Sequence, residues 1–323
     1  MANSYISGIH HITAIVGDPQ KNVDFYSGVL GLRMIKKTVN FDAPDTYHLY
    51  YGDETGTPGS VLTFFPWGEG SWRGRAGTGQ VSVISFIIPV NSIDYWMERL
   101  QLADLSVQGP TRRFDEEVIG FQDPDGIQLE LVATDQYQMN PWGEGPVPAE
   151  MAIGGFYNAT LAVRDHRNTV NLLTEHFGYS LRENSGNRYR LVNASGEMGS
   201  IVDVLELPDG PEGRMGAGAI HHIAWRVPGD DEQFKKREEL VQKGYQITPV
   251  MDRNYFHSIY FREPGNILFE IATDSPGFLI DETLEELGKN LKLPAWLEKR
   301  RPELEDRLTP VKAAKLPYAI VQE

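Results

Sequence analysis

Residues 8–16 read GIHHITAIV, and residues 219–227 read AIHHIAWRV. The two stretches share five of their nine residues, including both neighbouring histidines. Each is short and largely apolar, which is typical of a buried strand. Self-similar segments far apart in a chain indicate repeated structural units. We therefore expect the same strand in equivalent units near both ends of this chain.

A second similar pair lies later in these units. Residues 121–135 read FQDPDGIQLELVATD, and residues 261–274 read FREPGNILFEIATD. Counted from the first phenylalanine, both place a glutamate at the tenth position, at Glu130 and Glu270. A carboxylate inside an apolar strand is costly to bury unless it is paired or coordinated. Glu270, in the apolar run ILFEIA, is therefore a candidate ligand.

The repeat has a period of about 65 to 75 residues. Strand-like segments begin near Ile9, Val81, Phe156 and Ile220. A helical pattern follows each of them, at residues 19–31, 91–100, 168–179 and 231–245. Three short alternating runs separated by turn residues complete each unit. The sequence thus predicts an α+β fold of four βαβββ modules, two in residues 6–135 and two in residues 151–275.

Segments rich in proline and glycine separate the modules. Residues 66–79 lie between the first and second modules, and residues 136–150 form a linker between the second and third. A C-terminal tail, residues 276–323, follows the fourth module, with helices expected at 281–291 and 294–308. The tail could cover a site, form a dimer contact or expose an amphipathic helix.

The composition excludes several classes of function. Of 323 residues, 30 are Lys or Arg and 45 are Asp or Glu, which gives a formal net charge of −15. A surface this acidic repels phosphate backbones and anionic lipid, so we expect neither nucleic-acid nor membrane binding. The absence of cysteine excludes thiolate metal sites and thiol nucleophiles. No signal peptide or membrane-spanning run is evident, so we expect a cytoplasmic protein.

The histidine pairs supply candidate metal ligands. Adjacent residues on a strand point to opposite faces, so only one histidine of each pair is expected to face the inner surface of a sheet. Ile12 and Val16 mark the helix-covered face of the first strand. His11 is then on the inner face, and so is His222 by the same argument. Two imidazoles and one carboxylate with open positions form the facial triad of non-haem Fe(II) oxygenases. Mn(II) would accept the same ligands, and Zn(II) and Ni(II) stay open.

The pairing of modules decides whether these ligands meet. The first module with the second offers only His11 and Glu130, and the third with the fourth offers only His222 and Glu270. The first with the fourth collects His11, His222 and Glu270 in one cup. We prefer this pairing, and we expect Glu130 to be a structural remnant in a second cup without a complete site.

These segments resemble a known superfamily. The two HHI strands and the runs FYSGVLGL and DPDGIQLELV resemble the modules of the vicinal-oxygen-chelate superfamily of glyoxalases, bleomycin-resistance proteins and extradiol dioxygenases. The resemblance covers about residues 6–275 and implies two cupped-sheet halves. More narrowly, the chain resembles ring-cleaving dioxygenases that act on hydroquinones, the MhqO and PcpA types. Their iron ligands map onto His11, His222 and Glu270.

Part of the extradiol signature is also present. Tyr260, Glu263 and Glu270 keep its spacing. Its glycine or proline is replaced by Asn266, and its upstream histidine is replaced by Arg253. The hydroquinone branch resembles this sequence in having an arginine there. The departure therefore favours a para-diol over a catechol as substrate.

The resemblance also implies roles beside the metal, which map onto His10, Thr13, His221, Arg253 and Tyr260. Tyr260 would hydrogen-bond the substrate oxygen at the metal, and Arg253 would stabilise negative charge. His10, His221 and His257 are candidates for proton transfer, because histidine titrates near neutral pH. An aromatic pocket is expected from Tyr47, Phe64, Phe65, Trp67 and Trp225.

The implied activity is Fe(II)-dependent ring opening of a hydroquinone by O2, in aromatic catabolism or detoxification, and a homo-oligomer is compatible with it. Two alternatives stay open. A glyoxalase-like lyase or isomerase would need a fourth ligand from the run SVLTFFP, which offers Phe64 or Phe65 instead of a glutamate. A metal-free protein that sequesters an aromatic toxin would need no His-His-Glu set.

Overall fold

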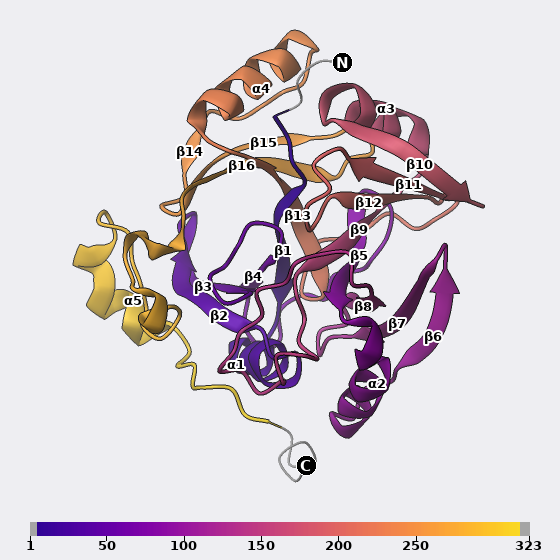
Figure 1. Cartoon of the computed structure of the whole chain (residues 1–323). Helices are drawn as coiled ribbons and strands as arrows, with labels where there is room; N and C mark the ends of the chain where they lie inside the picture. The colour runs from indigo at the N-terminus through magenta and orange to yellow at the C-terminus, as the bar shows by residue number, and fades with distance from the viewer. Residues whose placement is uncertain (1–4, 317–323) are drawn as a thin grey trace.

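Two curled eight-stranded sheets form the body of the protein, as the computed structural model of residues 5–316 shows (Figure 1). The predicted α+β fold of repeated modules with two cupped sheets and a helix in the C-terminal tail is confirmed. Within the described residues, no helix has the length and apolar character needed to cross a membrane. The last residues of the predicted tail, 317–323, lie outside the described residues.

One sheet, here called sheet I, contains the strands of the first and fourth modules. Its order is β14-β15-β16-β13-β1-β4-β3-β2, and β1 pairs with β13 in antiparallel register. The strands are β1 (Ile9–Val16), β2 (Arg33–Asn40), β3 (Ala43–Gly52), β4 (Val61–Pro66), β13 (Ala219–Val227), β14 (Met251–Asp252), β15 (Phe256–Arg262) and β16 (Leu268–Pro276).

The other sheet, sheet II, contains the strands of the second and third modules in the order β10-β11-β12-β9-β5-β8-β7-β6. Its central pair, β5 and β9, is antiparallel like the central pair of sheet I. The strands are β5 (Gln80–Ile88), β6 (Gln108–Arg113), β7 (Glu116–Gln122), β8 (Gln128–Ala133), β9 (Phe156–Val163), β10 (Tyr179–Ser185), β11 (Arg188–Asn193) and β12 (Ile201–Glu206).

Each module contributes one helix that packs on a sheet. Figure 1 shows α4 along β15 and β16, and α3 along β10 and β11. The helices are α1 (Pro19–Val23), α2 (Ile93–Leu102), α3 (His166–His176), α4 (Asp230–Gln242) and the tail helix α5 (Arg301–Arg307). Asp18 caps α1 by accepting from the backbone of Gln20 and Lys21, and α1 continues as a π-helix over Asp24–Val29.

The two faces of β1 have different environments. Ile12, Ala14 and Val16 are fully buried in the main hydrophobic core. His11 lies on the other face and lines a cavity. Alternation along the strand thus separates packing residues from polar residues, as the sequence pattern predicts.

A β-bulge interrupts each of the four central strands at an equivalent position. The extra residue is His10 in β1 and His221 in β13, and it is Ser82 in β5 and Tyr157 in β9. A bulge places two residues opposite one and redirects a side chain. In sheet I the inserted residue is the first histidine of each pair.

The segment 281–291 is not the helix that its sequence predicts. Only Leu284–Glu286 forms a single 3₁₀ turn, and the chain then runs beside β2. Gly288 has a positive φ of 73° and packs on the backbone of Met34 so closely that a Cβ would lie 2.1 Å from the carbonyl oxygen. The fully buried Lys36 ammonium donates to the carboxylates of Asp281 and Glu282. These contacts outweigh local helix propensity.

Candidate metal centre

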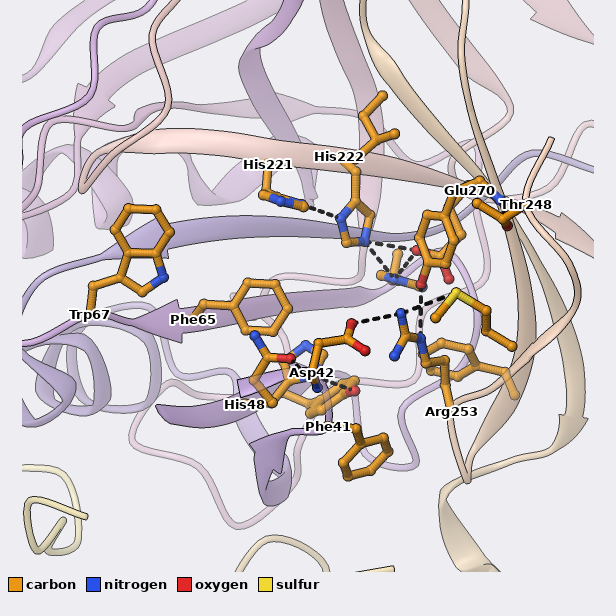
Figure 2. Close-up of a pocket in the computed structure, with 17 residues that line it drawn as sticks. Phe41, Asp42, His48, Phe65, Trp67, His221, His222, Thr248, Arg253 and Glu270 are labelled. Carbon is orange, nitrogen blue, oxygen red and sulfur yellow. Dashed lines mark hydrogen bonds and ion pairs between the residues drawn. The ribbon is translucent and has the colours of Figure 1, made fainter. Parts of the chain in front are cut away.

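Three side chains from β1, β13 and β16 converge at one point of sheet I (Figure 2). Oε2 of Glu270 lies 2.8 Å from Nε2 of His222 and 3.4 Å from Nε2 of His11. The two Nε2 atoms are 3.3 Å apart. Ligands at right angles and about 2.1 Å from one ion are about 3.0 Å apart, so these atoms are spaced as three donors on one face of an octahedron.

Glu270 carries an unused acceptor at this point. Its side chain is fully buried, and Oε1 accepts a hydrogen bond from the hydroxyl of Ser258. Within residues 5–316, Oε2 has no hydrogen-bond partner of good geometry, although the two Nε2 atoms lie close to it. A buried carboxylate oxygen in this state is costly unless a cation binds it. The donor set therefore fits a divalent metal ion.

The protonation states also suit metal binding. Burial lowers the pKa of His222, although the charge of Glu270 partly opposes that shift. Burial acts to raise the pKa of Glu270, but His11 and His222 hold it well below its usual range. A neutral imidazole and an ionised carboxylate are the forms that bind metal ions.

The first histidine of each pair contacts the second. Nδ1 of His10 lies 2.9 Å from Nδ1 of His11, and Nδ1 of His221 lies 2.8 Å from Nδ1 of His222. Burial, followed by the neighbouring histidine, lowers the pKa of His10 well below 6.5 and that of His221 to about 3. The neutral outer imidazoles can accept an N–H from the inner ones, which directs each inner Nε2 lone pair to the metal position.

Sheet II carries the equivalent carboxylates but pairs them with arginine. Glu130 accepts from the guanidinium of Arg113 and from the hydroxyl of Ser85. Asp203 accepts from Arg190 at 2.8 Å and 3.0 Å. Protein cations thus neutralise the second cup, and Glu130 has a structural partner there.

A cavity of about 430 Å³ opens onto the three ligands, within the usual size range for small-molecule sites. Residues far apart in the sequence form its walls: His11, Asn40, Phe41, Asp42, His48, Tyr50, Phe65, Trp67, His221, His222, Thr248, Met251, Arg253, Phe256, Tyr260, Leu268 and Glu270. Arg253 spans the cavity, since Nε donates to the Tyr260 hydroxyl at 3.2 Å and Nη2 donates to Asp42 at 3.0 Å (Figure 2).

A family model described as the glyoxalase, bleomycin resistance protein and dioxygenase superfamily matches residues 8–131 and 155–271 of this chain. The chain belongs to this superfamily. The two matched segments are the two halves of the predicted repeat, and they supply both sheets.

Relatives within the superfamily match over nearly the whole chain. MhqO of Bacillus subtilis, named as a ring-cleaving dioxygenase, is 46% identical over 96% of this chain and 98% of its own length. A protein of Sphingobium indicum named chlorohydroquinone/hydroquinone 1,2-dioxygenase is 33% identical over 93% of this chain and 95% of its own. A crystal structure of a Bacillus subtilis protein described as a dioxygenase has a TM-score of 0.93, with 45% identity over 96% of this chain and 99% of that one.

The repeat identifies the position in sheet I from which a fourth metal ligand would come. In each module, the residue three positions after the bulge pairs with a residue of the neighbouring strand. In three modules that partner is a carboxylate: Glu270, Glu130 or Asp203. In the first module it is Thr63, opposite Thr13. The expectation that Phe64 or Phe65 fills this position is wrong, because β4 pairs with β1 in the register that places Thr63 opposite Thr13. A hydroxyl there leaves three ligands in sheet I.

Sequence reasoning missed His48 and Tyr50, which both line the cavity. The run YHLYYG alternates between the two faces of a strand. The sequence could have found His48 and Tyr50 only by showing which face of that strand points to the cavity. His48 hydrogen-bonds Thr63 and the Tyr50 hydroxyl, each at 2.8 Å. Burial lowers the pKa of His48 well below 6.5 and raises that of Tyr50 well above 10.

The prediction that five aromatic residues line the pocket is wrong for three of them. Tyr47, Phe64 and Trp225 pack in the hydrophobic core, while Phe65 and Trp67 line the cavity. Each misplaced aromatic lies on the opposite face of its strand from a cavity residue.

The other expected residues lie at varying distances from the cavity. Tyr260, Arg253 and His221 line it, so both histidines of the second pair face the cavity, contrary to strict alternation. Thr13 is buried behind the wall and contacts Thr63 at 2.7 Å. His257 lies outside the cavity and contacts Asp230 at 2.6 Å, which argues against proton transfer by that side chain.

Proposed function

We propose that this protein is a ring-cleaving dioxygenase that binds Fe(II) through His11, His222 and Glu270 and opens the ring of a hydroquinone. Mn(II) suits the same donors. The buried Oε2 of Glu270 carries the proposal, because it meets two Nε2 atoms at the cavity wall and has no hydrogen-bond partner within residues 5–316. The names of the two relatives support ring cleavage and a hydroquinone-type substrate.

A bound Fe(II) ion would supply the electrons and open coordination positions that O2 chemistry requires. The chain orients the substrate. Phe65 and Phe256 offer apolar surfaces for an aromatic ring. The Tyr260 oxygen accepts from Arg253, so its own O–H can donate to a substrate oxygen. The guanidinium of Arg253, 16% exposed, can stabilise negative charge that develops on the substrate.

The reaction balances without a further reductant. Cleavage of the bond beside a hydroxylated carbon converts that carbon into a carboxylic acid and its neighbour into an aldehyde or acyl group. Both atoms of O2 enter the product, so hydroquinone plus O2 accounts for every atom. No thiol or protein redox group takes part, which agrees with a chain that has no cysteine.

Oxygen uptake by protein loaded with Fe(II) without air tests the proposal. We expect uptake with hydroquinone that exceeds uptake with catechol, and loss of both metal binding and uptake in His11→Ala, His222→Ala and Glu270→Ala. His257→Ala is the control, because this histidine lies outside the cavity. Full metal content in the three ligand variants would contradict the ligand assignment. Uptake with catechol alone would contradict the substrate assignment.

A further inference from the structure

β3 presents polar groups to the cavity of sheet I that are separate from the metal ligands. Its alternation places His48 and Tyr50 on the cavity face, whereas Tyr47, Leu49 and Tyr51 pack in the core. Tyr50 is only 1% exposed, so its hydroxyl must find partners in the protein or in a molecule inside the cavity.

Four side chains form one hydrogen-bonded row behind this wall. Nδ1 of His48 lies 2.8 Å from the Tyr50 hydroxyl, and Nε2 lies 2.8 Å from Oγ1 of Thr63. Oγ1 of Thr63 lies 2.7 Å from Oγ1 of Thr13. Within residues 5–316, neither end of the row has another side-chain hydrogen bond.

The protons available on the hydroxyls and on the His48 ring determine which group donates in each hydrogen bond of the row. A neutral His48 donates through one ring nitrogen and accepts through the other. If Nε2 carried the proton, Thr63 would donate to Thr13, and the fully buried Thr13 proton would have no acceptor. If Nδ1 carries it, Thr13 donates to Thr63, Thr63 to His48, and His48 to Tyr50. The second arrangement gives every donor of the row an acceptor except the Tyr50 hydroxyl, whose proton is left for a partner inside the cavity that Tyr50 lines.

Tyr50 and Tyr260 both line the cavity and come from strands on opposite sides of the ligand strands. In sheet I the order β15-β16-β13-β1-β4-β3 puts Tyr260 beyond the ligand strands on one side and Tyr50 beyond them on the other. A para-diol held at the three ligands through one oxygen would direct its second oxygen away from them. The second oxygen of a catechol stays beside the first.

We propose that the Tyr50 hydroxyl, oriented by His48, is the donor that binds the second oxygen of a para-diol and selects it over substrates without an oxygen there. The inference rests on the proposed function and names the residue that sets its substrate class. Tyr50 would touch the substrate, and His48 would be a positioning residue that acts through Tyr50.

Calorimetric titration of the Fe(II)-loaded protein without O2 tests this, with hydroquinone and phenol as probes. Wild type should bind hydroquinone more tightly than phenol. Tyr50→Phe should weaken hydroquinone binding about five- to tenfold, the usual effect of one lost hydrogen bond, and leave phenol binding unchanged. Tyr47→Phe is the matched control, because it removes a hydroxyl from the core face of the same strand.

His48→Leu tests the positioning role. It should weaken hydroquinone binding without lowering metal content, and should add little to Tyr50→Phe in the double variant, because both changes remove one interaction. Equal hydroquinone binding by wild type and Tyr50→Phe would overturn the inference even if oxygen uptake is intact. Loss of the hydroquinone preference in Tyr50→Phe would support the inference even if the protein takes up no oxygen. Absence of oxygen uptake would refute only the proposed function.

Discussion

Removing the outer histidine of the first pair should weaken metal binding without touching a ligand. In the variant His10→Leu, Nδ1 of His11 loses the acceptor that lies 2.9 Å away. Metal at Nε2 forces the His11 proton onto Nδ1, whereas the metal-free ring can move its proton to Nε2 and avoid the loss. The penalty therefore falls on the metal-bound state.

The structure sets the size of this effect. His10 and His11 are each 2% exposed, so water cannot replace the lost acceptor. A buried donor without a partner costs about 1–3 kcal/mol, which weakens metal affinity about five- to 150-fold. The equivalent variant His221→Leu should lose less, because His221 is partly exposed at the cavity wall and water can take the place of its Nδ1.

Competition between the protein and a chromophoric chelator for Mn(II) measures the affinity. His10→Asn is the matched variant, since its amide is close to leucine in size and keeps an acceptor, and it should recover part of the affinity. His257→Leu, outside the cavity, should bind Mn(II) like wild type. Wild-type affinity in a folded His10→Leu variant would refute the idea that the outer histidine orients the ligand.

Two further predictions concern stability. Burial keeps His10, His48 and His221 neutral in the native state while the unfolded chain protonates them, so the metal-free protein should lose stability as pH falls below about 6.5. Each contributes about 1.4 kcal/mol between pH 7.5 and 5.5, hence about 4 kcal/mol for the three, and equal urea midpoints at these two pH values would contradict this. Arg113→Leu should lower the free energy of unfolding by about 3 kcal/mol in urea titrations, because Glu130 is left without its cation. An unchanged urea midpoint or a reduced metal content would count against a purely structural role for this ion pair.

The repeat made the fold and the candidate ligands predictable from sequence. His11 and His222 recur at equivalent positions, and alternation assigned both of them to the inner face, where they line the cavity with Glu270. A helix-covered face and a polar face differ in composition, so pattern alone separates them.

The bulges and the cavity's outer wall were not predictable in the same way. A bulge adds one residue to one strand and reverses the alternation beyond it, and nothing in the sequence marks His221 as the inserted residue. The register that places Thr63 opposite Thr13 depends on strand pairing and not on a local sequence pattern. In the run YHLYYG both faces carry aromatics, so polarity could not tell Tyr47 from Tyr50. The tail segment 281–291 has helical composition, but the buried ammonium of Lys36 binds it in an irregular form.

The central claim is that side chains from the first and fourth modules bind one divalent ion. Anomalous diffraction from a crystal soaked in Mn(II) tests it most directly. The account predicts one strong peak in contact with Nε2 of His11, Nε2 of His222 and Oε2 of Glu270. A peak confined to the partly exposed group Asp165, His166 and Glu206, or no peak at all, would contradict it.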